Sequence, residues 1–403
     1  MRNDRGSVSL VAVTMMAMVL VLAAAVSSVP AAASAANPGV PGQAQPPPPD
    51  PYAGYPDRTV TPDPDRALPP SGPSPLASVP TRAVVADPDT IAPVTGDGAG
   101  DGYVTYGTTV VGFGPCGEES VWARWFVPFV VSGSGDAIGL DLACITGDAM
   151  PAGPGAWAEP EGAVWAPSVV HHGGRYVMYY TASKRGSGQK CIGKAGSASP
   201  LGPFADEGEV VCPGNGRWAF DPDAFVHAGD LYMVYRDDAI TTGADSGISV
   251  VRMDGSGAAD LSTRRDVLRS TDITWEEAGS SFHTIENPTM MDVGGAFHVF
   301  FSGNDWDSAR YSTGIAVCSG PLPTSPCSPY ASTSRPYFGH TGPEGIDPIQ
   351  GLPGNERGPG GMALFRSRSG EARVVWHFLV GTTIVRRGMA GTLAYDGNVW
   401  TVS

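Results

Sequence analysis

The chain has 403 residues, a net charge of −15, 54 glycines and 38 prolines. The negative charge argues against nucleic acids and anionic membrane surfaces as partners, because both require a basic face. The sequence has no P-loop, no GxGxxG turn after a strand and no GxSxG motif, so nothing supports nucleotide chemistry or hydrolysis by a serine elbow. The composition indicates an exported, turn-rich protein made mostly of β-strands.

Residues 1–35 have the features of a signal peptide. Two arginines precede an apolar stretch from Val8 to Val26, and Ala33-Ser34-Ala35 offers the small-residue pattern that signal peptidase accepts. We expect cleavage after Ala35. An uncleaved membrane anchor is the alternative, since the stretch is nearly long enough to span a bilayer. The protein is therefore expected to be secreted or associated with the cell wall or cell surface.

Residues 36–80 are rich in proline and contain almost no apolar runs. Such a segment cannot bury a core, so we predict an extended spacer that holds a folded domain away from the membrane or the wall. A tail with no role is the alternative. The folded unit is predicted to start close to Val84 and to occupy residues 81–403.

One local pattern recurs along residues 81–403. An acidic residue follows an apolar one, with a proline one or two positions later, and a Gly-Asp or Gly-Gly turn then leads into a short strand-like run. The acids are those of Asp87-Pro88, Asp221-Pro222 and Glu286-Asn287-Pro288, and their runs are 103–106, 231–235 and 297–301. Two copies lack the acid: they begin at Trp165-Ala166-Pro167 and Gly358-Pro359-Gly360-Gly361, with runs at 176–180 and 374–378.

Five such units predict an all-β fold, a five-bladed β-propeller. Their spacing of roughly 55 to 80 residues exceeds the about 40 to 50 of common propeller repeats, as expected if each four-stranded blade carries a long loop. Tyrosine, valine, isoleucine and phenylalanine alternate over short stretches between turns, and no segment sustains a helical period.

The six cysteines lie in three close sequential pairs. An even count in an exported chain favours three disulfides, and nearest-neighbour pairing would close one loop in or beside each of three blades. The predicted pairs are Cys116–Cys144, Cys191–Cys212 and Cys318–Cys327, although the spacing alone leaves other connectivities open. Metal binding is the weaker alternative, because no CxxC or HxxxH spacing occurs.

Three carboxylates are predicted to meet at one end of the propeller axis, where the innermost strands converge: Asp87, Asp221 and Glu286. Carboxylates that are close together and partly buried cannot all ionise freely, which gives a protonated acid beside an ionised base at neutral pH. Glycoside hydrolysis requires such a pair. Asp89 and Asp223 compete with Asp87 and Asp221, because on an alternating strand they point the same way, one step farther along.

These segments resemble glycoside hydrolase family 43, whose members are five-bladed β-propellers acting on arabinan, arabinoxylan and related furanosides and xylosides. The resemblance runs from about Val84 to the C-terminus. It covers the Ala-Asp-Pro, Trp-Ala-Pro, Asp-Pro and Glu-x-Pro openings of the first four blades and the connecting segment Ser199-Pro200-Leu201-Gly202-Pro203-Phe204. It implies that Asp87 is the general base, that Asp221 orients the acid and tunes its pKa, and that Glu286 is the general acid.

The sequence departs from the family pattern in two places. Many members carry a histidine in the axial channel, near a bound calcium or water, where this chain has Gly361. We therefore expect no metal and no other cofactor, with an axial calcium as the alternative. Ser168 stands where the family often has an aspartate, which leaves the substrate contacts of the second blade open.

Several aromatic and cationic residues are candidates for substrate contacts. The aromatic rings could stack on sugar faces, and the arginines and the histidine could bind hydroxyl groups. A core role for the rings and a solvated surface role for the arginines are the competing interpretations. The candidates are Trp165, Trp306, Arg310 and His377, with Trp218 and Arg236 as further choices.

The sequence therefore predicts a secreted, monomeric, inverting glycosidase that cleaves arabinofuranosyl or xylosyl linkages in a polysaccharide. The resemblance includes no β-sandwich of the kind that shapes the pocket in many β-xylosidases of the family, so we expect arabinofuranosidase or arabinanase chemistry. One alternative is a non-catalytic propeller that binds a glycan or a wall partner; another is a retaining propeller of the sucrose- and fructan-cleaving kind. Carboxyl groups about 5 Å apart would indicate retention, and about 6.5 to 9.5 Å inversion.

Overall fold

The computed structural model describes residues 83–99, 102–132, 142, 144–214, 216–242, 245–275, 284–308, 310–330, 336–339, 356–380, 385–395 and 400–402. The predicted signal peptide, residues 1–35, and the predicted spacer, residues 36–80, lie outside the described residues. Among the residues described, no helix has the length and apolar character needed to cross a membrane.

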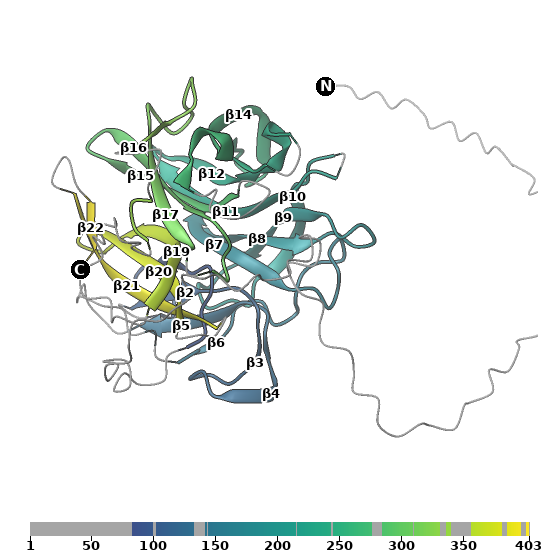
Figure 1. Cartoon of the computed structure of the whole chain (residues 1–403). Helices are drawn as coiled ribbons and strands as arrows, with labels where there is room; N and C mark the ends of the chain where they lie inside the picture. The colour runs from purple at the N-terminus through teal and green to yellow at the C-terminus, as the bar shows by residue number, and fades with distance from the viewer. Residues whose placement is uncertain are drawn as a thin grey trace, which may run out of the picture. The chain divides into compact units, whose positions relative to one another are not determined.

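Five antiparallel sheets of four strands each form the blades of the described domain (Figure 1). Blade 1 contains β1 (Asp89–Ile91), β2 (Tyr103–Tyr106), β5 (Pro128–Ser132) and β6 (Gly147–Asp148). Blade 2 contains β7 (Val164–His172), β8 (Arg175–Ser183), β9 (Lys190–Ser197) and β10 (Ala205–Val211). Blade 3 contains β11 (Ala219–His227), β12 (Asp230–Asp237), β13 (Gly247–Met253) and β14 (Ala259–Arg269). Blade 4 contains β15 (Ile285–Val293), β16 (Ala296–Gly303), β17 (Ser312–Cys318) and β18 (Ser328–Pro329), and blade 5 contains β19 (Glu356–Arg366), β20 (Ala372–Val380), β21 (Arg386–Tyr395) and β22 (Trp400–Val402).

Two kinds of element interrupt this repeat. A two-stranded hairpin, β3 (Val110–Phe113) and β4 (Glu119–Trp125), is inserted between the second and third strands of blade 1 and projects from the body in Figure 1. Single 3-10 turns, η3 (Asp238–Ile240) and η4 (Ser270–Asp272), follow strands of blade 3. The strand-like runs predicted from sequence are the second strands of the blades: β2, β8, β12, β16 and β20.

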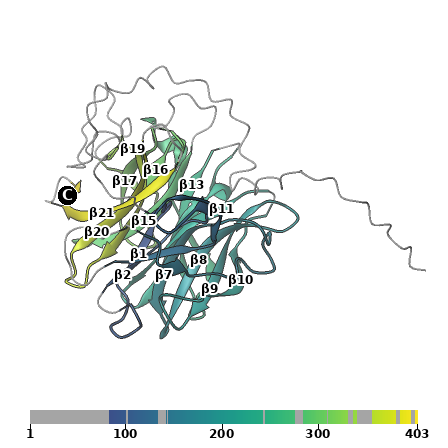
Figure 2. The ribbon, with the colours of Figure 1, turned by 90° about the horizontal axis from the view of Figure 1, so that it is seen from below.

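The first strands form a closed ring. They contact one another in the order β1, β7, β11, β15 and β19, and β19 contacts β1 again. Val84 also pairs with Arg387 of β21, so the chain just before blade 1 adds to the last blade. In Figure 2 the yellow strands β20 and β21 lie beside the segment that carries β1 and β2. The predicted all-β, five-bladed propeller is confirmed.

The hydrophobic core is divided among the blade interfaces. Five apolar clusters occur, each between two neighbouring blades: Tyr106 and Tyr180 belong to one, and Tyr103 and Phe365 close the ring in another. A strand inside a blade is therefore buried on both faces, as in β8, whereas exposure alternates along the outer strand β10. This explains why the second strands are near-continuous apolar runs.

The three predicted disulfides are confirmed. They join Cys116 to Cys144, Cys191 to Cys212 and Cys318 to Cys327, at sequence separations of 28, 21 and 9 residues. The first ties the turn of the β3–β4 hairpin to the segment before β6. Each bridge stabilises the fold by about 3 kcal/mol, chiefly by restricting the unfolded chain.

Candidate active site

Each inner strand has a residue with a left-handed backbone at the bulge in its first half, or two residues before its start in blade 1. These first-level residues are Asp87 (φ 46°), Ala166 (45°), Asp221 (53°), Asn287 (46°) and Gly361 (57°). A proline follows four of them, and the pairing of the first two strands shifts register at this point in blades 2 to 5. Aspartate and asparagine tolerate this conformation better than most residues, and such strain concentrates at functional sites.

Asn287, and not Glu286, occupies the fourth first-level position. Glu286 pairs with Ser302, and in blade 2 the equivalent pair is Thr181 with Trp165, the residue before Ala166. Glu286 therefore lies one position earlier in the repeat than Asp221. The prediction that all three acids occupy equivalent repeat positions is therefore corrected. The physical reason is that the proline fixes the bulge, and Pro288 directly follows Asn287.

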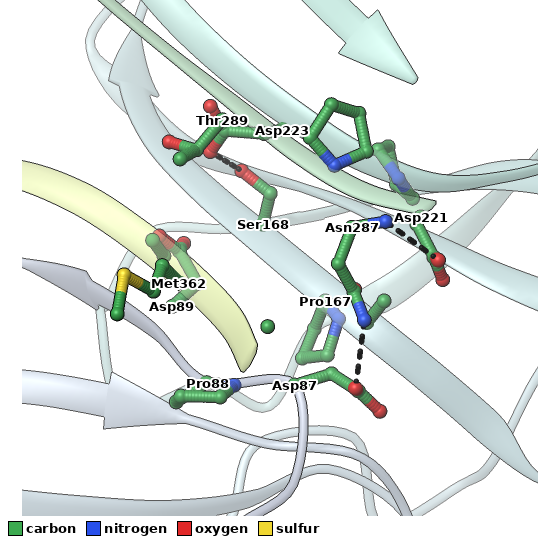
Figure 3. A pocket seen from close by; sticks show the side chains of 15 residues that line it. Asp87, Pro88, Asp89, Pro167, Ser168, Asp221, Asp223, Asn287, Thr289 and Met362 are labelled. Carbon is green, nitrogen blue, oxygen red and sulfur yellow. Dashed lines mark hydrogen bonds between the residues drawn. The ribbon is translucent and has the colours of Figure 1, made fainter. Parts of the chain in front are cut away.

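A pocket lies where the five inner strands meet, and each blade contributes three of its lining residues. Figure 3 shows two levels along it. Asp87 and Asp221 flank Asn287 at one level. Asp89 and Asp223 lie at the other, which we call the second level: the residues two positions after the left-handed ones, namely Asp89, Ser168, Asp223, Thr289 and Ala363.

Asp87 is surrounded by hydrogen-bond donors. Its Oδ2 accepts from Thr108 Oγ1 at 2.6 Å, and its Oδ1 accepts from Asn287 Nδ2 at 3.1 Å and from Arg386 Nη1 at 2.9 Å. Burial alone would raise the pKa of Asp87, but the charge of Arg386 and the donated bonds outweigh it, and the pKa lies below its ordinary value. The site thus keeps Asp87 ionised.

Glu286 is also buried, with fewer donors. Its Oε1 accepts from Tyr311 Oη at 3.1 Å, and its Oε2 accepts from Arg236 Nη1 at 3.0 Å. The charge of Arg236 is shared between two carboxylates, because Arg236 also donates to both carboxylate oxygens of Asp238, at 2.9 and 3.3 Å. Burial raises the pKa of Glu286 above its ordinary value in spite of Arg236, and the charge of Asp87 adds to the rise.

Asp221 holds the backbone next to Glu286. Its Oδ2 accepts the N–H of Asn287 at 3.1 Å, and its own N–H donates to Thr181 Oγ1 at 3.0 Å. Burial, followed by the charges of Glu286 and Asp87, raises the pKa of Asp221. Asp221 and Glu286 therefore cannot both ionise freely.

A chain of hydrogen bonds connects Asp87 to Glu286. Asn287 Nδ2 donates to Asp87 Oδ1 and also to Tyr311 Oη at 3.0 Å, and Tyr311 Oη donates to Glu286 Oε1. Two polar groups thus bridge the carboxylates. The network links the positions of the two carboxylates.

The second-level acids have a different environment. Asp89 Oδ2 accepts the N–H of Val169 at 2.7 Å, and Asp223 Oδ2 accepts the N–H of Met290 at 3.2 Å, each from the next blade. Burial raises the pKa of Asp89 to about 7 and that of Asp223 well above its ordinary value. Neither has an arginine among its hydrogen-bond partners in the described part of the chain, so these competing candidates lack the contacts of Asp87 and Glu286.

The four predicted substrate-contact residues lie in different environments. Trp306 is half-buried, with the Arg386 guanidinium 4.6 Å from its ring centroid. Trp165 is only 2% exposed, with Lys190 Nζ 5.1 Å from its ring centroid. Arg310 is half-buried on the loop after β16, and His377 is fully buried in β20. Trp306, which is partly exposed and stacks on Arg386 beside Asp87, therefore has the strongest geometric case of the four for contacting a sugar.

Three residues of this network were not predicted from the sequence: Asn287, Tyr311 and Arg386. Asn287 could have been found, because aligning the prolines of the repeats places it in the column of Asp87 and Asp221. Tyr311 and Arg386 lie on a loop end and a third strand, and no motif surrounds them.

The residues at the axial position do not fit the calcium site that the resemblance implies. Gly361 occupies the position where the resemblance places a histidine, and Nδ1 of the nearby His377 already accepts the N–H of Asp87. Among the described residues, Cys191, Glu209 and Cys212 also cluster, but both cysteines are in a disulfide.

Comparison with known proteins identifies the family. The model of glycosyl hydrolases family 43 matches residues 144–387, and the chain belongs to this family. The protein is a glycosidase. No curated protein sequence matches the chain.

Solved structures have the same fold. A thermostable family-43 glycoside hydrolase is 21% identical, with a TM-score of 0.60, over 81% of this chain and 95% of its own. An endo-1,4-beta-xylanase from Bacteroides thetaiotaomicron is 20% identical, with a TM-score of 0.56, over 80% and 95%. An endo-arabinase from the same organism is 16% identical, with a TM-score of 0.57, over 82% and 99%.

Proposed function

We propose that this family 43 glycosidase is an exported, inverting enzyme that cleaves arabinofuranosyl or xylosyl linkages in a polysaccharide. The observation that carries the proposal is the opposite treatment of two buried carboxyls. Donors and Arg386 favour the ionised form of Asp87, and burial favours the protonated form of Glu286. An ionised base facing a protonated acid is the requirement of glycoside hydrolysis.

The two groups would act in one displacement. Asp87 takes a proton from a water molecule while the oxygen of that water bonds to the anomeric carbon. At the same time Glu286 gives its proton to the glycosidic oxygen, and the bond between that oxygen and the anomeric carbon breaks. Water attacks the face opposite the leaving group, so the anomeric configuration inverts. Exchange of protons with solvent then restores Asp87 as carboxylate and Glu286 as acid.

Asp221 is assigned to positioning the acid. Its bond to the Asn287 N–H holds the peptide that follows Glu286, and the charge of Glu286 raises the pKa of Asp221, so the two carboxyls titrate as a coupled pair. Arg386 and Trp306 form a cationic and aromatic pair beside Asp87, suited to a sugar face and its hydroxyls. Three disulfides support an extracellular location.

The substrate class rests on the family and on the arabinan- and xylan-cleaving activities of the similar structures. Nitrophenyl arabinofuranosides, nitrophenyl xylosides and linear arabinan test it, with the configuration of the first product followed by NMR. Inverted arabinose or xylose products are expected. Retained configuration would favour the nucleophilic mechanism, and glycan binding without hydrolysis would favour the non-catalytic propeller.

A further inference from the structure

Side chains from one blade repeatedly hold the left-handed residue of the next. In blades 2, 4 and 5 the supporting residue occupies the same register position of the second strand: Thr181 pairs with Trp165, Ser302 with Glu286, and His377 with Gly360. Each accepts a backbone N–H from the following blade. The bonds are Asp221 N to Thr181 Oγ1 at 3.0 Å, Gly361 N to Ser302 Oγ at 2.8 Å, and Asp87 N to His377 Nδ1 at 3.0 Å.

In blades 1 and 3 the supporting contact is made by a different residue. Thr108, just after β2, accepts the N–H of Ala166 at 3.0 Å. In blade 3 the matching position holds Arg236, which pairs with Phe220 in register and reaches Glu286 instead. The N–H of Asn287 is then taken by Asp221. Every first-level residue is therefore held by a side chain of the preceding blade.

We infer that His377 is a positioning residue for the reaction: it holds Asp87 in its left-handed conformation through the backbone N–H and so aims the carboxylate. This inference rests on the proposed role of Asp87 as the base. The contact lies at the seam between the last and first blades, where Arg386 also reaches Asp87 and Val84 pairs with Arg387. Closure of the ring and placement of the base share these contacts.

The chemistry of the imidazole fits this role. Nδ1 can accept a hydrogen bond only without a proton, so His377 must be neutral with its proton on Nε2. Burial, together with the charge of Arg386, lowers the pKa of His377 to about 3. Its ring is fully buried and stacks on Tyr311, with centroids 5.5 Å apart and planes 9° apart. In the described structure His377 cannot contact a sugar, so it acts through Asp87 and Tyr311.

The same contact explains the glycine at position 361. A Cβ added to Gly361 would lie 2.6 Å from both Cε1 and Nδ1 of His377, and the backbone φ is +57°. No side chain fits there while the imidazole keeps its place. The histidine that the family resemblance leads one to expect on the first strand is thus sterically replaced by one from the second strand.

Two substitutions separate positioning from mere packing. His377→Phe keeps an aromatic ring against Tyr311 and removes the acceptor, whereas His377→Asn can present Oδ1 where Nδ1 lies. We expect His377→Phe to lower kcat about tenfold to a hundredfold, with KM changed less than about threefold. Because Asp87 would lose its alignment with Arg386, the acid limb of the pH profile of kcat/KM should move to higher pH. His377→Asn should recover most of kcat and the parent acid limb.

Tyr103→Phe is the matched control at the same seam. Tyr103 Oη accepts the N–H of Arg368 at 3.2 Å, a contact between blades 1 and 5 whose residues do not line the pocket. Its loss should lower the melting temperature and leave kcat and the acid limb unchanged. The inference is overturned if His377→Phe behaves like Tyr103→Phe, or if a folded His377→Asn fails to restore kcat.

Two further measurements make the outcome independent of variant folding and of the proposed function. Nitrogen NMR of the histidine-labelled parent should find His377 neutral, with Nδ1 unprotonated, well below pH 6. A protonated Nδ1 overturns the inference even if His377→Phe does not fold.

Asp87→Asn tests the base itself. Full activity in that variant would remove the proposed function, whereas an inactive Asp87→Asn beside an unaffected His377→Phe would remove only the role of His377.

Discussion

The seam between blades 5 and 1 and the seam between blades 3 and 4 each pair a buried carboxylate with an arginine, yet the outcomes are opposite. Arg386 and two further donors lower the pKa of Asp87, whereas the pKa of Glu286 stays raised beside Arg236. The difference lies in how the charge is shared, because Arg236 also binds both oxygens of Asp238. An arginine contact alone therefore does not assign a carboxylate its protonation state.

Removing either carboxylate should give the largest effect. Asp87→Asn and Glu286→Gln are each expected to lower turnover at least about a hundredfold, since each removes one proton-transfer partner. The two should differ in their dependence on the leaving group. A nitrophenolate departs without protonation, so Glu286→Gln should lose less on an activated substrate than on arabinan, whereas Asp87→Asn should lose similarly on both.

Kinetics on both substrates and thermal melting of each variant provide the check. Melting temperatures near that of the parent exclude unfolding as the cause. Activity close to that of the parent in either variant would remove that residue from the mechanism, and equal losses on both substrates for Glu286→Gln would argue against its role as the acid.

Neutralising each arginine should shift opposite limbs of the pH–rate profile. Arg386→Gln raises the pKa of Asp87, which must be ionised, so the acid limb should move to higher pH by roughly one unit or more. Arg236→Gln raises the pKa of Glu286, which must be protonated, so the alkaline limb should move to higher pH. Breaking a buried pair also destabilises the fold by about 3 to 5 kcal/mol, so both profiles must be recorded well below the melting temperature. An acid limb that stays in place in Arg386→Gln, or that moves in Arg236→Gln, would contradict the assignment.

Asp221→Asn should have a smaller effect on pH dependence. The charge of Glu286 raises the pKa of Asp221, so the two carboxyls titrate as a coupled pair. Removing one member lowers the pH at which the pair loses its last proton, so the alkaline limb should move to lower pH while turnover also falls. The measurement needs a substrate slow enough that chemistry limits the rate. An unchanged limb would leave Asp221 as a structural or substrate-binding residue.

The fold was predictable because each blade is marked by features that involve residues close together in the sequence. Prolines after a left-handed residue and apolar second strands recur in every blade or nearly so, and neighbouring cysteines close local loops. The three acids could be found for the same reason. Tyr311, Arg386 and the actual contact of His377 could not, because each depends on which side chains face one another across a blade seam, and sequence separations of 24 to 299 residues intervene.

The second-level acids should affect stability rather than catalysis. Burial raises the folded-state pKa of Asp89 to about 7, above the about 3.9 of an unfolded aspartate, so the folded protein holds an extra proton between these values. The stability from this group is full below the unfolded pKa and is lost as the pH rises through about 7. Asp89→Asn mimics the protonated form, so its unfolding free energy relative to the parent should increase from pH 4 to pH 7, by on the order of 1 to 4 kcal/mol. Urea unfolding at several pH values measures this, and a difference that is constant with pH would mean that Asp89 stays ionised in the channel.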